Sequence, residues 1–261
     1  MLPCAPFRPA AAHNGGMVPP GSVALVTGAA RRLGRAIALR LAEGGLRVAV
    51  HYRGSAREAA AVVRRIRRAG GTARAFPADL SRAGAPARLV RSVERALGPV
   101  EVLVNSASVF GPTPVLGGRP GDMDPILALN LRAPWLLARA AAPGMVRRGR
   151  GRIVNLGDAA ADRPLRDHGP YAASKAALHA LTVSLSRDLA PAVQVNCVAP
   201  GAILLPKGAP ASRRRRLERA IPAGRLGTPE EIAEAVAFFV FGPSFVTGEV
   251  LRVDGGRHGR G

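Results

Sequence analysis

The sequence predicts a single α/β domain with a doubly wound parallel sheet of about seven strands and helices on both faces. Short apolar segments with strand character alternate with longer segments of helical periodicity along most of the 261 residues. Hydrophobic residues make up 48% of the chain, which excludes a disordered protein. A chain of this length can bury a large core within one domain.

The first predicted strand covers residues 22–27 and is mostly apolar, as is typical of a parallel strand buried on both faces. Six further strands are predicted, with centres near Val48, Ala73, Val102, Val154, Val195 and Leu251. Helices are expected between them. Ligands bind outside the carboxyl ends of such strands, so the residues that follow each strand are the candidates for a site.

A glycine-containing turn connects the first strand to a helix predicted at 36–42. The turn contains Gly28, Arg31, Arg32, Leu33 and Gly34. Its backbone N–H groups and the start of the helix can together bind phosphate. The order of strand, turn and helix therefore predicts a dinucleotide site, with a purely structural turn as the alternative.

The end of the second strand indicates which dinucleotide is bound. An NAD site carries an acid near this position for the ribose hydroxyls. Here no acid lies between the end of this strand and Glu58, which begins the next helix. Instead, a 2′-phosphate could be surrounded by Arg31, Arg53 and Ser55. This arrangement predicts NADPH rather than NADH. The alternative is that these arginines only reflect an arginine-rich chain. The cofactor contacts predicted at this strand end are His51, Tyr52, Arg53 and Ser55.

Tyr171 and Lys175 lie four residues apart in a predicted helix, so their side chains share one face. A phenol titrates near pH ~10, and a neighbouring ammonium lowers that pKa, so the pair is a candidate proton donor. Lys207 is the one other lysine in the chain, which favours a specific need for an ammonium at position 175. Asp158, thirteen residues before the tyrosine, is a further candidate catalytic residue.

These features resemble the short-chain dehydrogenase/reductase family over residues 23–256. The resemblance implies a Rossmann-fold reductase in which Tyr171 and Lys175 also contact NADPH, and Asn130 holds a water that connects Lys175 to solvent. Asp79 is expected to meet the adenine, and Asn105 is expected to line the cofactor cleft. The cofactor contacts that the resemblance adds are Asp79, Leu80, Asn105, Ser106, Ala107, Pro200 and Gly201.

Three departures from the common family pattern resemble its pteridine reductase branch, which includes dihydromonapterin and dihydrofolate reductases. Arg32 replaces the middle glycine of the turn, Ser106 replaces the second Asn of an Asn-Asn-Ala motif, and Asp158 replaces the catalytic serine. Three further segments, 105–114, 163–165 and 200–205, are also similar to that branch. The substrate contacts that this resemblance implies are Arg32, Ser108, Phe110, Asp158 and Tyr171.

The chemistry of these side chains suits a pterin. Phe110 offers a flat apolar face to a flat ring, and the Arg32 guanidinium offers a fork of donors. A carboxyl at position 158 can help deliver a proton to a ring nitrogen, whereas an ionised one would oppose the alkoxide formed in carbonyl reduction. The alternatives are that Asp158 only caps a loop and that Phe110 only packs in the core.

The sequence therefore predicts NADPH-dependent reduction of a dihydropterin or pterin, with a 3-oxoacyl thioester or other carbonyl reductase as the main alternative. Two lesser alternatives are a non-catalytic NADPH-binding protein and a nucleic-acid-binding protein. The Tyr171–Lys175 pair argues against the non-catalytic protein. The net charge of +21 raises the last possibility. However, the arginines are spread along the chain, and aromatic residues make up only 4%, too few for base stacking.

The remaining composition bounds the organisation of the chain. Residues 1–21 are rich in Pro, Ala and Gly and are expected to form a flexible tail before a domain at 22–261. Neither a disulfide nor a metal site is predicted from Cys4, Cys197 and the five scattered histidines. No apolar run is long enough to span a bilayer. A cytoplasmic protein is therefore expected. The family resemblance implies a substrate lid near 206–221, which contains Arg213–Arg216, and a homotetramer.

Overall fold

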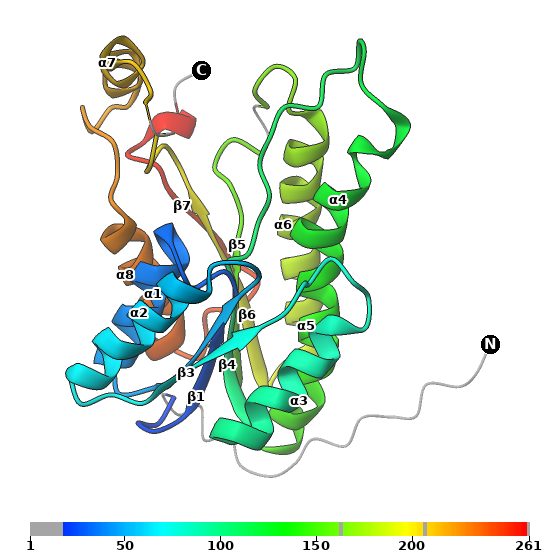
Figure 1. Ribbon diagram of the computed structural model, residues 1–261, viewed down its shortest axis with the longest axis vertical. Helices are drawn as coiled ribbons and strands as arrows, with labels where there is room; N and C mark the ends of the chain where they lie inside the picture. Colours follow the sequence, from blue (N-terminus) through cyan, green and yellow to red (C-terminus); the bar gives the residue numbers. More distant parts are fainter. Residues whose placement is uncertain (1–17, 162–163, 206–207, 260–261) are drawn as a thin grey trace.

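The computed structural model describes residues 18–161, 164–205 and 208–259. It confirms the predicted fold class, because seven parallel strands form one sheet in the order β3-β2-β1-β4-β5-β6-β7 (Figure 1). Residues 1–17, Arg163 and Lys207 lie outside the described residues. The strands are β1 (Val23–Val26), β2 (Arg47–Tyr52), β3 (Ala73–Pro77), β4 (Val100–Asn105), β5 (Gly151–Leu156), β6 (Val193–Pro200) and β7 (Val250–Val253).

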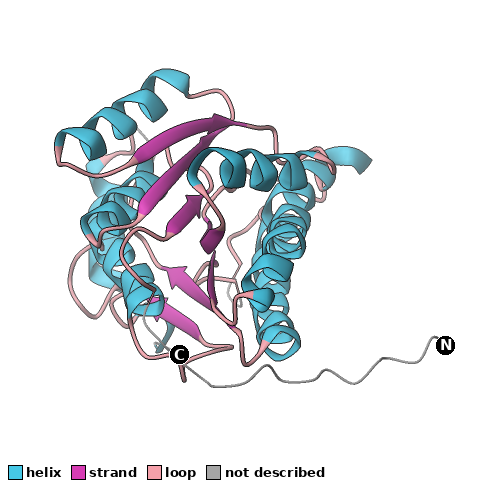
Figure 2. Ribbon diagram, turned by 90° about the horizontal axis from the view of Figure 1, so that it is seen from below, coloured by secondary structure: helices cyan, strands magenta, loops and turns pink. Residues whose placement is uncertain are grey.

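Helices cover both faces of the sheet (Figure 2). One face carries α1 (Arg32–Glu43), α2 (Ala56–Arg68) and α8 (Pro229–Phe241), and the other carries α3 (Ala85–Leu97), α5 (Ala133–Arg147) and α6 (Gly169–Leu189). In the described ranges, no helix combines the length and the apolar character that a membrane span needs. The shorter elements are η1 (Pro120–Asp122), α4 (Asp124–Leu127), the π-helical turn η2 (Ala128–Arg132), α7 (Ala211–Ala220) and η3 (Arg257–Gly259).

The core explains why these segments form strands and helices. Every residue of β1, β4, β5 and β6 is buried, as expected for central parallel strands covered on both faces. Helix α2 buries Ala59, Val62, Val63 and Ile66, which recur every three or four residues, while its arginines stay exposed. Burial of each larger apolar side chain contributes roughly 1.5–3 kcal/mol, so packing stabilises this helix.

The packed domain begins before the predicted boundary at residue 22. Val18 is buried, and the Gly21 N–H group donates to the Gly45 carbonyl at 2.9 Å. Residues 18–21, which the sequence assigned to a tail, therefore pack against the chain that connects α1 to β2.

The turns after β1 and β4 are joined by one buried hydroxyl. The chain leaves β1 toward β2 and β3 and returns to β4 on the opposite side, so a topological switch point lies between β1 and β4. Thr27 Oγ1 accepts the N–H groups of Ser106 at 2.9 Å and Ala107 at 3.0 Å, and donates to the Val104 carbonyl at 3.3 Å. This hydroxyl fixes the edge of the sheet at which the candidate site lies.

We expect Thr27→Val to lower the free energy of unfolding by roughly 2–3 kcal/mol, because it leaves two N–H groups without their acceptor. Chemical denaturation of parent and variant measures this loss. Thr72→Val, at an exposed position, is the control and should change stability by less than about 0.5 kcal/mol. Equal stabilities of the two variants would contradict a joining role for Thr27.

Candidate active site

The glycine-containing turn has the geometry of an anion site. Gly28 has a φ of +64°, and a Cβ there would lie 3.0 Å from Ala107 Cα. A Cβ on Gly34 would lie 2.4 Å from the Gly28 carbonyl oxygen, so both positions require glycine. No side chain caps the start of α1, and its first turn holds no acid. The unpaired N–H groups at this helix start therefore fit the pyrophosphate of a dinucleotide.

Arg32 occupies a backbone conformation that favours glycine. Its φ is +51°, at the position where the common family pattern has glycine, and such a conformation costs about 1–2 kcal/mol. Its Nη2 donates to the Leu204 carbonyl at 3.5 Å, so the side chain reaches from the turn to the segment after β6. This position suits a residue that contacts both cofactor and substrate.

His51 is buried and binds the glycine-containing turn through the backbone of Gly28, rather than facing a ligand. Its Nδ1 accepts from the Gly28 N–H group at 3.1 Å, and its Nε2 lies 3.1 Å from the Ala78 carbonyl, to which it can donate. Burial lowers the pKa of His51 to about 4, against the opposing effect of the bond to Ala78. The predicted direct cofactor contact is therefore corrected to a positioning role, because both ring nitrogens are already bonded within the protein.

The remaining residues at the end of β2 are arranged around the start of α2. Arg31 forms an ion pair with Glu58 in the first turn of α2, so a carboxylate stands beside a predicted phosphate ligand. Ser55 precedes that helix without using its hydroxyl as a cap, and Arg53 is exposed. Tyr52 is half-buried and packs on the core. Arg53 and Ser55 thus keep their polar groups available.

Asp79 binds its own turn. One carboxylate oxygen accepts from the Ser81 hydroxyl at 2.6 Å and from the Ser81 N–H group at 3.1 Å. These hydrogen bonds lower the pKa of Asp79 below its ordinary value. Leu80 is buried in the core. Contact of Asp79 with adenine stays a prediction, and Leu80 is placed to pack rather than to bind.

The ends of β4 and β6 provide backbone and amide groups. Asn105 is buried and donates from Nδ2 to Asn155 Oδ1 at 2.8 Å, while its own Oδ1 has no partner among the described residues. Ser106 and Ala107 are held by Thr27, as described above. The Pro200 carbonyl accepts from the Ala159 N–H group at 3.0 Å, and a Cβ on Gly201 would collide with Asp254 at 2.5 Å. The orphaned Asn105 oxygen is an acceptor that a ligand could use.

Tyr171 and Asp158, which the family resemblance grouped in one site, are in direct contact. The Tyr171 hydroxyl donates to Asp158 Oδ2 at 2.7 Å, and Asp158 Oδ1 accepts from the Ala160 N–H group at 2.8 Å. Asp158 therefore caps its loop and also binds the phenol. Burial, followed by the charge and the hydrogen bond of Asp158, raises the pKa of Tyr171. The expectation that Lys175 lowers this pKa is wrong, because burial and then the carboxylate both favour the neutral phenol.

Lys175 is buried beneath the tyrosine. Its Nζ donates to the Leu156 carbonyl at 2.7 Å and lies 5.8 Å from the centre of the Tyr171 ring. Burial lowers the pKa of Lys175 to about 8, although Asp158 and Cys197 oppose this shift. Burial also raises the pKa of Cys197 to about 12, so that thiol is not a nucleophile.

Asn130 lies in the π-helical turn η2, and protein groups occupy its side-chain amide. Oδ1 accepts from the Ser108 hydroxyl at 3.1 Å and the Val109 N–H group at 2.9 Å. Nδ2 donates to the Val109 carbonyl at 3.0 Å and to Ser174 Oγ at 3.1 Å. The water expected to connect Lys175 to solvent cannot be held by this side-chain amide, because both of its N–H groups and its oxygen already bond to protein groups. The Ser108 hydroxyl, a predicted substrate contact, is directed to Asn130.

Phe110 is exposed over 56% of its surface, which argues against the alternative that it only packs in the core. Its ring contacts Tyr171 edge-on at 4.8 Å and stacks on His168 at 4.6 Å. His168 was missed by sequence reasoning, although its place three residues before Tyr171 puts it on the same side of the helix start. Within the described ranges, no group of three or more His, Cys, Asp or Glu could hold a metal ion.

Comparison with known proteins identifies the family. The family profile described as enoyl-(acyl carrier protein) reductase matches residues 28–258. A 3-oxoacyl-(acyl-carrier-protein) reductase of Staphylococcus aureus is 34% identical over 239 residues, which cover 90% of this chain and 97% of that protein. The chain belongs to the short-chain dehydrogenase/reductase family.

Two solved structures of the family have the same fold. A gluconate 5-dehydrogenase from Burkholderia cenocepacia, in complex with NADP and tartrate, is 30% identical with a TM-score of 0.85, and the match covers 93% of this chain and 97% of that one. A blue fluorescent protein from a metagenomic library, in complex with NADPH, is 37% identical with a TM-score of 0.84, covering 91% and 98%.

The buried state of His51 predicts a pH dependence of stability. The unfolded chain binds a proton on this residue near pH ~6.5, whereas the folded chain binds it near pH 4. The contribution of His51 is therefore complete above pH ~6.5 and is lost as pH falls toward 4, by roughly 3 kcal/mol. Urea denaturation between pH 7 and 4 should show a flatter profile for His51→Gln than for the parent. Parallel profiles would contradict this role.

Proposed function

We propose that this protein, an NADP-dependent oxidoreductase of its family, reduces the C=N bond of a dihydropterin or a related flat heterocycle with NADPH. The observation that carries the proposal is the 2.7 Å hydrogen bond from the Tyr171 hydroxyl to Asp158. A carboxylate in this place suits protonation of a ring nitrogen and disfavours the growth of an alkoxide. The NADP and NADPH named in the two solved relatives support the cofactor.

The side chains around this bond have distinct tasks in the proposed reaction. NADPH supplies the hydride when bound. Tyr171, kept as a neutral phenol, donates its proton toward the substrate nitrogen. Asp158 then takes a proton from solvent and passes it to the phenolate, which restores the neutral phenol. The exposed face of Phe110 stacks on the heterocycle, and Arg32 donates to its polar edge. Lys175, fixed by the Leu156 carbonyl, holds the ribose of the cofactor.

The relatives support a second candidate, a 3-oxoacyl thioester reductase. The Staphylococcus aureus protein carries that name, and so does a relative from Synechocystis that is 35% identical over 237 residues. These names favour the carbonyl alternative over the pterin assignment. The pterin proposal rests on Asp158, Arg32 and Phe110, which an ordinary carbonyl reductase does not require. A non-catalytic NADPH-binding role and a nucleic-acid-binding role gain no support from the site geometry.

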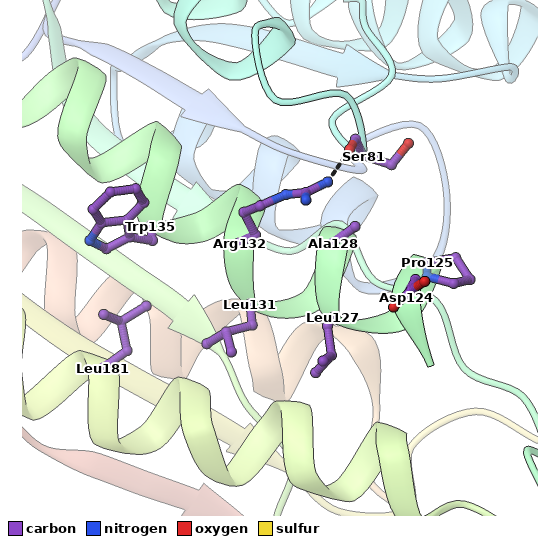
Figure 3. Close-up of a pocket in the computed structure, with 9 residues that line it drawn as sticks. All are labelled: Ser81, Asp124, Pro125, Leu127, Ala128, Leu131, Arg132, Trp135 and Leu181. Carbon is purple, nitrogen blue, oxygen red and sulfur yellow. Dashed lines mark hydrogen bonds between the residues drawn. The ribbon is translucent and has the colours of Figure 1, made fainter. Parts of the chain in front are cut away.

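We also propose that the protein is a cytoplasmic homotetramer. A groove of about 800 Å³ lies between α4, η2 and α5 on one side and α6 on the other. In Figure 3, Leu127 and Leu131 project toward α6, from which Leu181 projects back. Trp135, 43% exposed, continues this apolar face. Phe238 within α8 and Phe245 after that helix are also exposed. Two separate apolar faces suit the two interfaces of a tetramer.

Cofactor choice tests the residues at the end of β2. Because charged contacts to a phosphate contribute roughly 1.5–3 kcal/mol, Arg31→Ala with Arg53→Ala should weaken NADPH binding at least tenfold. The affinity for NADH should change little. Glu58→Gln is the matched control: it removes the carboxylate that pairs with Arg31 and should strengthen NADPH binding. Fluorescence titration measures the affinities, and equal NADPH and NADH binding by the parent would contradict the assignment.

The substrate is tested at position 158. Parent and Asp158→Ser are given dihydrobiopterin and an acetoacetyl thioester at saturating NADPH. Since general acid–base assistance is worth ~10²–10⁴-fold, Asp158→Ser should lose dihydropterin turnover by about that factor and gain thioester turnover. Tyr171→Phe should lose both activities and retain NADPH binding. A parent that reduces the thioester efficiently and ignores every dihydropterin would establish the second candidate instead.

A further inference from the structure

Helix α7 is a cationic element at the edge of the site that packing does not explain. Its ten residues bury no side chain. Isolated helices shorter than ~12–15 residues are marginal in water, so most helices of this size depend on a buried face. Helix α2 has the same number of arginines, five, but buries four apolar side chains. The arginines of α2 are the solvent face of a packed helix, whereas those of α7 have no such explanation.

Four consecutive arginines, Arg213–Arg216, surround α7, because successive residues on a helix point about 100° apart. All four are exposed. Arg214 pairs with Glu218 at 3.3 Å, while no ion pair is found for Arg213, Arg215 or Arg216 among the described residues. Close like charges destabilise a helix, so an anionic ligand bound here would relieve a repulsion that the chain leaves uncompensated.

The position of α7 connects this charge to the reaction. The helix follows β6 and stands at the end of the molecule at which α6 begins (Figure 1). Ile203 before it and Ile221 after it are buried, and the Ala223 N–H group donates to the Gly255 carbonyl at 3.1 Å. Both flanks are thus fixed to the carboxyl edge of the sheet. Leu204, which Arg32 contacts, belongs to the segment that leads into α7.

We propose that Arg213, Arg215 and Arg216 bind the acidic tail of an extended substrate, in which a chain of carboxylates is attached to the flat ring reduced at Tyr171. This inference rests on the proposed function and narrows its substrate class to conjugated pterins of the folate type. Charge complementarity selects the occupant: three unpaired guanidinium groups match several carboxylates. One molecule then spans the ring site and α7, since both lie at the same edge of the sheet.

The test compares dihydropterin substrates with different numbers of carboxylates in the tail, of which the two folates differ only in the number of glutamates. Dihydrobiopterin has none, dihydrofolate has one glutamate, and dihydrofolate with five γ-linked glutamates has the longest tail. The variants are Arg213→Gln/Arg215→Gln/Arg216→Gln on α7 and, as a matched control that removes the same charge, Arg64→Gln/Arg65→Gln/Arg68→Gln on the exposed side of α2. KM and kcat are measured at low and high salt.

We expect the KM of the parent to fall with tail length, and the α7 variant to raise KM for the long-tailed substrate roughly tenfold, as several weak ion pairs together would. Its kinetics with dihydrobiopterin should stay unchanged, the α2 variant should resemble the parent, and high salt should remove the difference. Equal KM values for all tails, or equal losses in the two variants, would overturn the inference.

A failure of the proposed function is distinguishable from a failure of this inference. If the parent reduces no dihydropterin, calorimetric titration with free penta-γ-glutamate still reports on α7. Binding by the parent that is lost in the α7 variant and kept in the α2 variant would support the tail site, and absence of binding would overturn it. If the α7 variant instead loses activity on a thioester borne by an acidic carrier protein, the occupant is that carrier, and the tail proposal is wrong.

Discussion

The close packing of the turns after β1 and β4 is the constraint on which the rest of the site depends. Gly28 approaches Ala107 so closely that any Cβ would meet its backbone, and Thr27 binds the same turn with its hydroxyl. His51 then fixes the Gly28 N–H group from β2. With these contacts in place, the start of α1 is directed at the switch point, and its N–H groups remain unpaired for an anion. The phosphate site is therefore a property of three strand ends rather than of one glycine motif.

Burial shifts the ionisable groups of the site in a consistent way. It lowers the pKa of His51 to about 4 and that of Lys175 to about 8, and it raises the pKa of Tyr171. Each pKa is shifted in the direction that favours the neutral form, as expected where water is excluded, although Lys175, with a pKa of about 8, remains mostly an ammonium at neutral pH. The carboxylate of Asp158 strengthens this effect at the phenol. Burial and the Asp158 carboxylate therefore both favour the protonated form of Tyr171.

The sequence predicted the features that depend on local periodicity and spacing. The strand and helix order followed from the apolar pattern, and the four-residue interval placed Tyr171 and Lys175 on one helix, α6. The family resemblance grouped Asp158 with Tyr171, and the two side chains are in contact. Features that depend on distant partners were not predictable: the pairing of Arg31 with Glu58, the saturation of the Asn130 amide, and the stacking of His168 on Phe110. His51 was misjudged because β2 extends to Tyr52, so its ring lies inside the sheet edge rather than in the loop that follows the strand.

The choice between C=N and C=O reduction finally depends on which neighbour controls the phenol. In this structure the ammonium of Lys175 is bound to the Leu156 carbonyl and lies below the ring, whereas the Asp158 carboxylate accepts the hydroxyl directly. A carbonyl substrate would need this phenol to stabilise a growing negative charge, against the field of a carboxylate in contact with it. A ring nitrogen that gains its proton before or together with the hydride carries no such charge, and Asp158, once protonated from solvent, can return a proton to the phenol. In the proposed reaction, Asp158 is therefore the residue that favours reduction of a C=N bond over a C=O bond beside Tyr171 and Lys175.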